Sequence, residues 1–148
     1  MDAWELEARE RIRETIARYA HHVDGGRFDE LVDLFAPDGV LEVEGEPAHR
    51  GREAIRAFVT GTGRDLKADT GAPRIRHHVT NVSIELDGPD RARARCYFLA
   101  VTDLGVDHWG RYGDELGRDG ETWRFVHRRV RTDGAAPSSW VAGRQPRD

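Results

Sequence analysis

The sequence has 148 residues, of which 38% are hydrophobic and 34% charged, and its formal net charge is −4. This length predicts one domain with one core, and the apolar content is too high for a disordered chain. The 23 basic residues are scattered among 27 acidic ones, a pattern that argues against nucleic acid or an anionic membrane as a partner. No apolar run approaches the ~20 residues that span a bilayer, and the acidic N-terminus is unlike an export signal, so we expect a cytoplasmic protein.

The first 60 residues show the three-and-four spacing of apolar side chains that is typical of amphipathic helices. Asp2 and Glu5 form a capping box at the start of the first helix, and Gly25-Gly26 supplies its end. The predicted helices cover residues 3–23, 28–36 and 52–60, and a short strand covers 40–43.

The second half of the chain changes to the two-residue alternation of β-strands, interrupted by turns rich in Asp and Gly. The predicted strands cover residues 74–86, 91–103, 107–118 and 122–132, after a polar loop over 61–73. Their short connections require antiparallel neighbours, and this meander must curl over the helices to bury its apolar face. We therefore predict an α+β fold: a cone-shaped α+β barrel in which three N-terminal helices pack on a strongly curved, mostly antiparallel sheet. The domain is expected to span 1–133, followed by a flexible tail over 134–148, and the predicted core contains Ile12, Ile16, Phe28, Phe35, Phe58, Phe98 and Phe125.

The strand over 91–103 is apolar on both faces toward its end, where Tyr97, Leu99 and Val101 alternate with core residues. A sheet covered by helices on one side would leave these three side chains in water, and an exposed apolar patch usually marks an interface. We predict a homodimer that forms through the sheet.

Polar groups suited to chemistry recur where a pocket is expected: Tyr19 and Asp24 near the end of the first helix, His77 and His78 in the first long strand, and Tyr112 in the third. Each also has a structural interpretation, such as a core tyrosine or a helix-end turn residue. Only one of two adjacent histidines in a strand can face the interior.

Other kinds of site lack their sequence patterns. No His-Glu-x-x-His, paired cysteines or carboxylate-rich loop is present for zinc or calcium, and no glycine loop for a phosphate. The single cysteine, Cys96, lies among small apolar residues, where a thiol stays protonated, and it has no disulfide partner. We expect no metal and no cofactor. A carboxylate and an imidazole remain, and this pair is suited to moving protons.

The order of the elements and several local motifs resemble the SnoaL-like branch of the nuclear transport factor 2 superfamily over nearly the whole chain, to about residue 133. The motifs that carry the resemblance are Ile16-Ala-Arg-Tyr19, Asp24-Gly-Gly-Arg-Phe-Asp29, Leu34-Phe-Ala-Pro-Asp38, Gly51-Arg-Glu-Ala-Ile55, Arg76-His77-His78-Val-Thr-Asn81, Gly110-Arg-Tyr112-Gly-Asp114 and Asp119-Gly-Glu-Thr-Trp123-Arg-Phe125. They are specific for the fold and weak for the reaction, because one fold hosts many activities.

The site layout is most similar to scytalone dehydratase, hexachlorocyclohexane dehydrochlorinase and bile-acid dehydratase, which implies that Asp24 and His77 form a proton-handling pair. The resemblance further implies that substrate is bound by Tyr19, His78, Asn81, Tyr112 and Arg128. Regular strand alternation would instead turn His78 toward the core, and a bulge near Thr80-Asn81 would restore His77. The next strand carries Ala100 and Val101 where the dehydratases have polar groups, so a barer site is expected.

The leading hypothesis is a cofactor-independent lyase that eliminates water from a small hydrophobic, polyketide- or steroid-like substrate. In it His77 removes a proton, Asp24 holds the ring, and Tyr19 donates to a substrate oxygen. The same groups could serve a cyclase or an isomerase, although no counterpart of the strand-borne base of ketosteroid isomerase is present. A non-catalytic domain that binds small ligands is the alternative from another class.

Overall fold

The computed structural model describes residues 1–70, 74–139 and 141. Its helices and strands are, in chain order, α1 (Ala3–Gly25), α2 (Phe28–Asp33), β1 (Phe35–Val43), β2 (His49–Arg50), α3 (Arg52–Thr70), β3 (Arg76–Asp87), β4 (Arg91–Thr102), β5 (Gly105–Asp119) and β6 (Thr122–Ala135).

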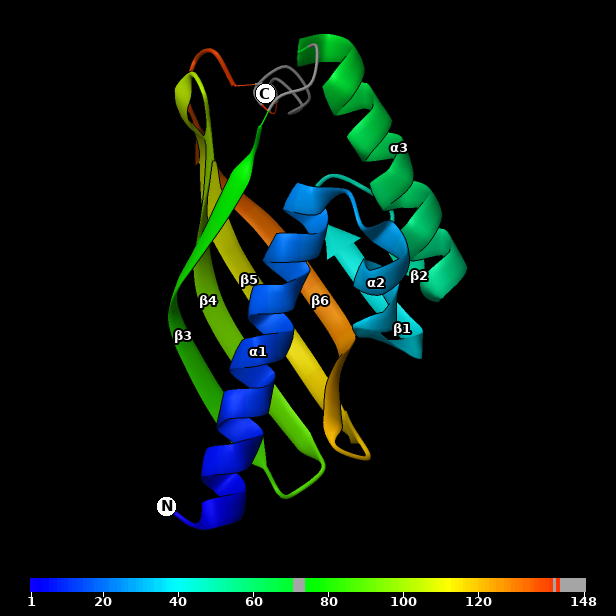
Figure 1. The fold of residues 1–148 in the computed structure, drawn as a ribbon, viewed down its shortest axis with the longest axis vertical. Helices are drawn as coiled ribbons and strands as arrows, with labels where there is room; N and C mark the ends of the chain where they lie inside the picture. Colours follow the sequence, from blue (N-terminus) through cyan, green and yellow to red (C-terminus); the bar gives the residue numbers. More distant parts are fainter. Residues whose placement is uncertain (71–73, 140, 142–148) are drawn as a thin grey trace.

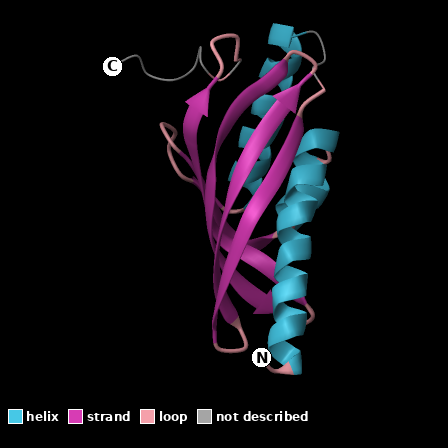
Figure 2. Cartoon of the chain, turned by 90° about the vertical axis from the view of Figure 1, so that its left-hand side faces the viewer, coloured by secondary structure: helices cyan, strands magenta, loops and turns pink. Residues whose placement is uncertain are grey.

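The six strands form one sheet in the order β2-β1-β6-β5-β4-β3. All neighbours are antiparallel except β1 and β6, which pair in parallel. The long strands twist and bend, and the helices gather on one side of them (Figures 1 and 2). This arrangement confirms the predicted α+β class with helices on a curved, mostly antiparallel sheet.

Helix α1 crosses the concave face of the sheet and packs against β3 and β6 (Figure 1). The capping box of Asp2 and Glu5 is present at its start. Five of the seven predicted core residues are buried, whereas Phe28 and Phe58 are partly buried and pack against the core. Of these two, Phe58 comes from α3, which with α2 covers the end of the sheet near β1 and β2.

The predicted and observed elements differ most at two places, and the short strand β2 was not predicted. The second helix ends at Asp33, and Phe35 already belongs to β1, because its backbone pairs with Phe125 of β6. Helix α3 runs to Thr70 through the predicted polar loop. The glycines that suggested a loop there include Gly63, where a Cβ would lie 2.9 Å from Cζ of Phe28. This glycine allows two helices to approach closely, and its low helix propensity is overridden by packing.

The predicted boundary of the domain at residue 133 falls inside β6, which continues to Ala135. Ala136 then donates its backbone N–H to the carbonyl oxygen of Asp107 at 2.8 Å. The remainder of the predicted flexible tail, residues 140 and 142–148, lies outside the described residues. Among the residues that the structure does describe, no helix is long and apolar enough to cross a membrane.

Candidate active site

Asp24 lies in the last turn of α1, which ends where Gly26 adopts the left-handed conformation (φ 66°). A carboxylate near a helix C-terminus meets the negative end of the helix dipole, so this position is electrostatically unfavourable unless a donor offsets it. The side chain is only 11% exposed. Its hydrogen-bond partners must therefore stabilise the charge.

A bulge decides which histidine of β3 faces inward. The register of β3 against β4 shifts around Asn81, whose φ is 55°. This extra residue reverses the alternation of side chains. As a result His77 shares the inner face with Ile84, and His78 is exposed. The alternative from regular strand alternation, with His78 toward the core, does not hold in this structure.

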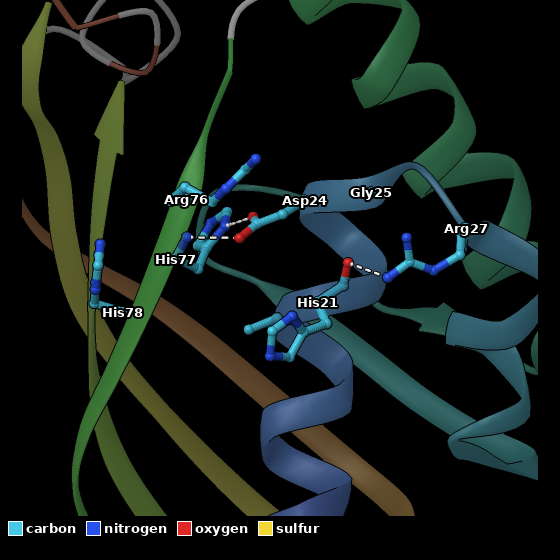
Figure 3. A pocket seen from close by; sticks show the side chains of 8 residues that line it. His21, Asp24, Gly25, Arg27, Arg76, His77 and His78 are labelled. Atoms are coloured by element: carbon cyan, nitrogen blue, oxygen red, sulfur yellow. Dashed lines mark hydrogen bonds and ion pairs between the residues drawn. The ribbon is translucent and has the colours of Figure 1, made fainter. Parts of the chain in front are cut away.

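Asp24 and His77 are joined by two hydrogen bonds across 53 residues of sequence. Oδ2 of Asp24 accepts the backbone N–H of His77 at 2.9 Å, and Oδ1 lies 2.6 Å from Nδ1 of the ring (Figure 3). Because β3 is an edge strand, its outward N–H groups lack a neighbouring strand. An ionised carboxylate can only accept, so Nδ1 carries the proton and Nε2 is left with its lone pair.

Sequence reasoning missed a second aspartate–histidine pair. Nδ1 of His108 lies 2.7 Å from Oδ2 of Asp107, and both side chains are 11% exposed. The register of β4 against β5 shifts after Ala100, which pairs with His108, so Asp107 sits at an irregularity of the strand. The only sequence signal was an Asp-His dipeptide just after Gly105, and alternation would have placed its side chains on opposite faces.

The two histidine rings line one cavity of about 240 Å³ between α1, α3 and the sheet. Its wall is mostly aliphatic and aromatic, as is usual for small-molecule sites. The lining residues with polar atoms in their side chains are Tyr19, Thr62, His77, His108, Tyr112 and Thr132. Within the described part of the chain, neither Nε2 of His77 nor that of His108 has a hydrogen-bond partner.

Burial shifts the pKa of three of these groups. It raises the pKa of Tyr19 and raises that of Tyr112 well above its ordinary value, so both phenols remain protonated donors at neutral pH. Burial also lowers the pKa of His108, against the opposing effect of Asp107. His108 is therefore a neutral imidazole at neutral pH.

Arg128 does not line the cavity, although it was a predicted substrate-binding residue. Its guanidinium donates two hydrogen bonds of 2.8 Å to Asp114, and both side chains are 0% exposed. Cζ lies 4.1 Å and 4.2 Å from the ring centroids of Tyr112 and Tyr19. The sequence could not reveal this burial, because the pairing depends on the register of β5 and β6. The guanidinium of Arg128 therefore packs against the rings of the two tyrosines and not against a ligand in the cavity.

Two other predicted binding residues also lie outside the cavity. Asn81 lies at the bulge and faces a hollow on the outer side of the sheet. His78 lies on the other side of β3 from Asp24 (Figure 3). It lines a polar hollow of about 440 Å³ together with His21 and Arg27. Asp24 and His77 line this hollow as well, so the pair separates the apolar cavity from a polar surface.

Neither a metal centre nor a reactive thiol is formed in the described part of the chain. No group of three or more His, Cys, Asp or Glu side chains there could hold a metal ion. Burial raises the pKa of Cys96 to about 11, so this thiol is protonated and inert as a nucleophile.

A curved sheet with helices on its concave face and a cavity at their junction defines a nuclear transport factor 2-like domain. The family model of the SnoaL-like domain matches residues 4–129, and the chain belongs to this family. No curated protein matches the sequence.

Three solved structures are similar to the chain. An NTF2-like protein with a cystatin-like fold from Novosphingobium aromaticivorans is 31% identical, with a TM-score of 0.75 over 94% of this chain and 88% of that one. A protein from Catenulispora acidiphila in complex with S-DNPA is 27% identical, with a TM-score of 0.74 over 85% and 93%. A protein from Novosphingobium aromaticivorans described as a candidate scytalone dehydratase has a TM-score of 0.78 over 92% and 91%; at 22% identity it shows the fold alone.

Proposed function

We propose that this protein is a cofactor-independent lyase that removes water from a small apolar substrate bearing a carbonyl and a hydroxyl group. The observation that carries the proposal is an imidazole fixed by a carboxylate at 2.6 Å on one side and lining an apolar cavity on the other. Such a carboxylate holds the ring in one tautomer and stabilises the imidazolium that forms when the ring takes a proton.

In the proposed reaction, Nε2 of His77 takes the proton from the carbon beside the carbonyl. The electrons of that C–H bond form the carbon–carbon double bond, and the bond to the hydroxyl oxygen breaks. The protonated His77 returns the proton to the departing oxygen, so water leaves and the enzyme is unchanged. Asp24 remains ionised throughout and stabilises the transient positive charge.

The other polar groups of the cavity serve the substrate oxygens. Tyr19 and Tyr112 are protonated, which supports a role as donors to the carbonyl oxygen as negative charge develops there. Neutral His108 offers an acceptor to the substrate hydroxyl, and so orients the leaving group. The geometry favours a catalytic role over ligand binding alone, because a protein that only binds a ligand needs no carboxylate hydrogen-bonded to the imidazole.

The experiment compares the wild type with His77→Ala and with His78→Ala, an exposed neighbour on the same strand. Small cyclic β-hydroxyketones serve as the substrate panel, and the conjugated enone product is followed by its ultraviolet absorbance. We expect turnover by the wild type and by His78→Ala, and a loss of ~10²-fold or more for His77→Ala, the scale of a missing general base. Full activity of His77→Ala would overturn the dyad. Saturable binding of the panel without any turnover by the wild type would favour a carrier.

A further inference from the structure

The chain after β6 returns to the active site. The segment formed by residues 136–139 and 141, here called the terminal segment, begins with the hydrogen bond from Ala136 to the carbonyl of Asp107. Ser139 is buried, and Val141 lines the cavity. The terminal segment therefore forms part of the wall beside His108.

Ser139 contacts the carboxylate that holds His108. Oγ of Ser139 lies 2.6 Å from Oδ2 of Asp107, the same oxygen that lies 2.7 Å from Nδ1 of His108. The backbone N–H of Val141 donates to Oγ of Ser139 at 3.0 Å. These contacts make one continuous chain of hydrogen bonds from the terminal segment to the imidazole.

The direction of this chain follows from donor and acceptor chemistry. An ionised carboxylate has no proton to give, so both the Ser139 hydroxyl and Nδ1–H of His108 must donate to Asp107. The Val141 N–H occupies an acceptor position of Ser139 and leaves its hydroxyl proton for the carboxylate. Nε2 of His108 is then the unprotonated nitrogen.

We propose that Ser139 is a positioning residue that acts through Asp107 to hold His108 in the tautomer with Nδ1 protonated and Nε2 free to accept. Its catalytic consequence rests on the proposed function, whereas the tautomer itself is a property of the protein without substrate. The position of Asp107 supports this role for Ser139. Asp107 lies at an irregularity of β5, where the regular alternation of the strand does not set the direction of the side chain. The hydrogen bond from Ser139, on a second segment of the chain, restrains the Asp107 carboxylate.

Among the residues that the structure describes, the charged and titratable groups that act on His108 are Asp107 on its own strand and His77 on β3, whose ring centroid is 6.2 Å away. Burial lowers the pKa of His108, so the neutral ring prevails at neutral pH and its tautomer is the relevant variable. A ring with the proton on Nε2 would instead donate into the cavity. The hydroxyl of Ser139 thus helps to hold the carboxylate that keeps Nε2 of this ring an acceptor.

The test is long-range ¹H–¹⁵N NMR of the imidazole nitrogens at mildly alkaline pH, with His108 assigned by comparison with His108→Gln. The wild type and Ser138→Ala, an exposed neighbour, should show His108 with a protonated Nδ1. Ser139→Ala should shift His108 toward a mixture of tautomers, and Ser139→Thr, which keeps a hydroxyl, should restore the wild-type pattern. The signals of His77, held by Asp24, should not change in Ser139→Ala and so report that the fold is intact.

An Nε2-protonated His108 in the wild type would overturn the proposal even if a variant fails to fold. An unchanged tautomer in Ser139→Ala would overturn it as well. With a turnover assay, Ser139→Ala should lower kcat by up to ~10²-fold, with KM nearly unchanged. A shifted tautomer in a protein without lyase turnover would leave the positioning role standing and reject the proposed function; turnover that depends on His77 together with an unchanged His108 would do the reverse.

Discussion

The rings of His77 and His108 lie edge to face with their centroids 6.2 Å apart, although their strands β3 and β5 do not pair with each other. Both histidines pair with Ala100 on the intervening strand β4. The methyl group of this fully buried alanine leaves room for two imidazoles on the same face. The small residue that suggested a bare site in the sequence is therefore what allows two strands to contribute a histidine each.

Asp24→Asn should lower turnover by ~10²-fold or more. An amide has one acceptor oxygen, whereas Asp24 accepts both from the backbone N–H of His77 and from Nδ1. The variant must lose one bond or turn the ring to the tautomer that protonates Nε2, which removes the base from the cavity. Steady-state kinetics beside Asp29→Asn, an exposed carboxylate of α2 paired with Arg56, gives the comparison. Equal rates for both variants would mean that Asp24 has only a structural role.

The stability of the fold should fall as the pH drops below the ordinary imidazole pKa of 6.5, in part because of His108. Burial lowers the folded-state pKa of this ring, so between that lowered value and 6.5 the unfolded chain binds more protons than the native one. Its contribution is complete above 6.5 and is lost as the pH falls through this window. His22, whose pKa burial also lowers, contributes in the same direction.

The measurement is urea unfolding of the wild type and His108→Gln across this range, above the pH at which carboxylates titrate. The variant should show a shallower loss of the free energy of unfolding toward acid. Parallel pH profiles for the two proteins would contradict the predicted shift of His108.

Asp114→Ala should reduce the free energy of unfolding by ~3–5 kcal/mol, because it leaves the charge of Arg128 buried without its partner. Both side chains are 0% exposed and share two hydrogen bonds. The pair of the exposed Asp119 and the partly exposed Arg124 is the control, and Asp119→Ala should cost at most ~1 kcal/mol. Urea unfolding measures both. Similar losses would show that burial adds nothing to the first pair.

The outer face of the sheet should mediate a homodimer, as the sequence predicted. Tyr97 is 57% and Trp109 41% exposed there, next to the partly exposed Leu99 and Val101. We expect a dimer in sedimentation velocity at high micromolar concentration and a monomer for Tyr97→Glu, since an unpaired charge in a buried interface is costly. Trp4→Glu, at an exposed aromatic position on α1 (42%), should leave the dimer intact. A monomeric wild type would refute the prediction.

The sequence alone determined the elements whose signals are local. The apolar spacing and capping box of α1 and the two-residue alternation of the four long strands fix these segments, because helix and strand periods appear directly in the order of residues. The motifs around Asp24 and His77 predict that these two residues form a pair, and their side chains are hydrogen-bonded in the structure. Even the choice between His77 and His78 could be reduced to one question, whether β3 carries a bulge.

Only the tertiary structure decided what depends on register and on distant partners. Bulges and register shifts place His77, Asp107 and His108, and a shift of one residue turns a side chain to the other face. The burial of Arg128 requires Asp114 from the adjacent strand. Helix α3 continues past Gly63, where the ring of Phe28 packs closely against the helix. The contribution of Ser139 is decided in the same way, since its partner Asp107 lies 32 residues away in the sequence and nothing local to either residue specifies the contact.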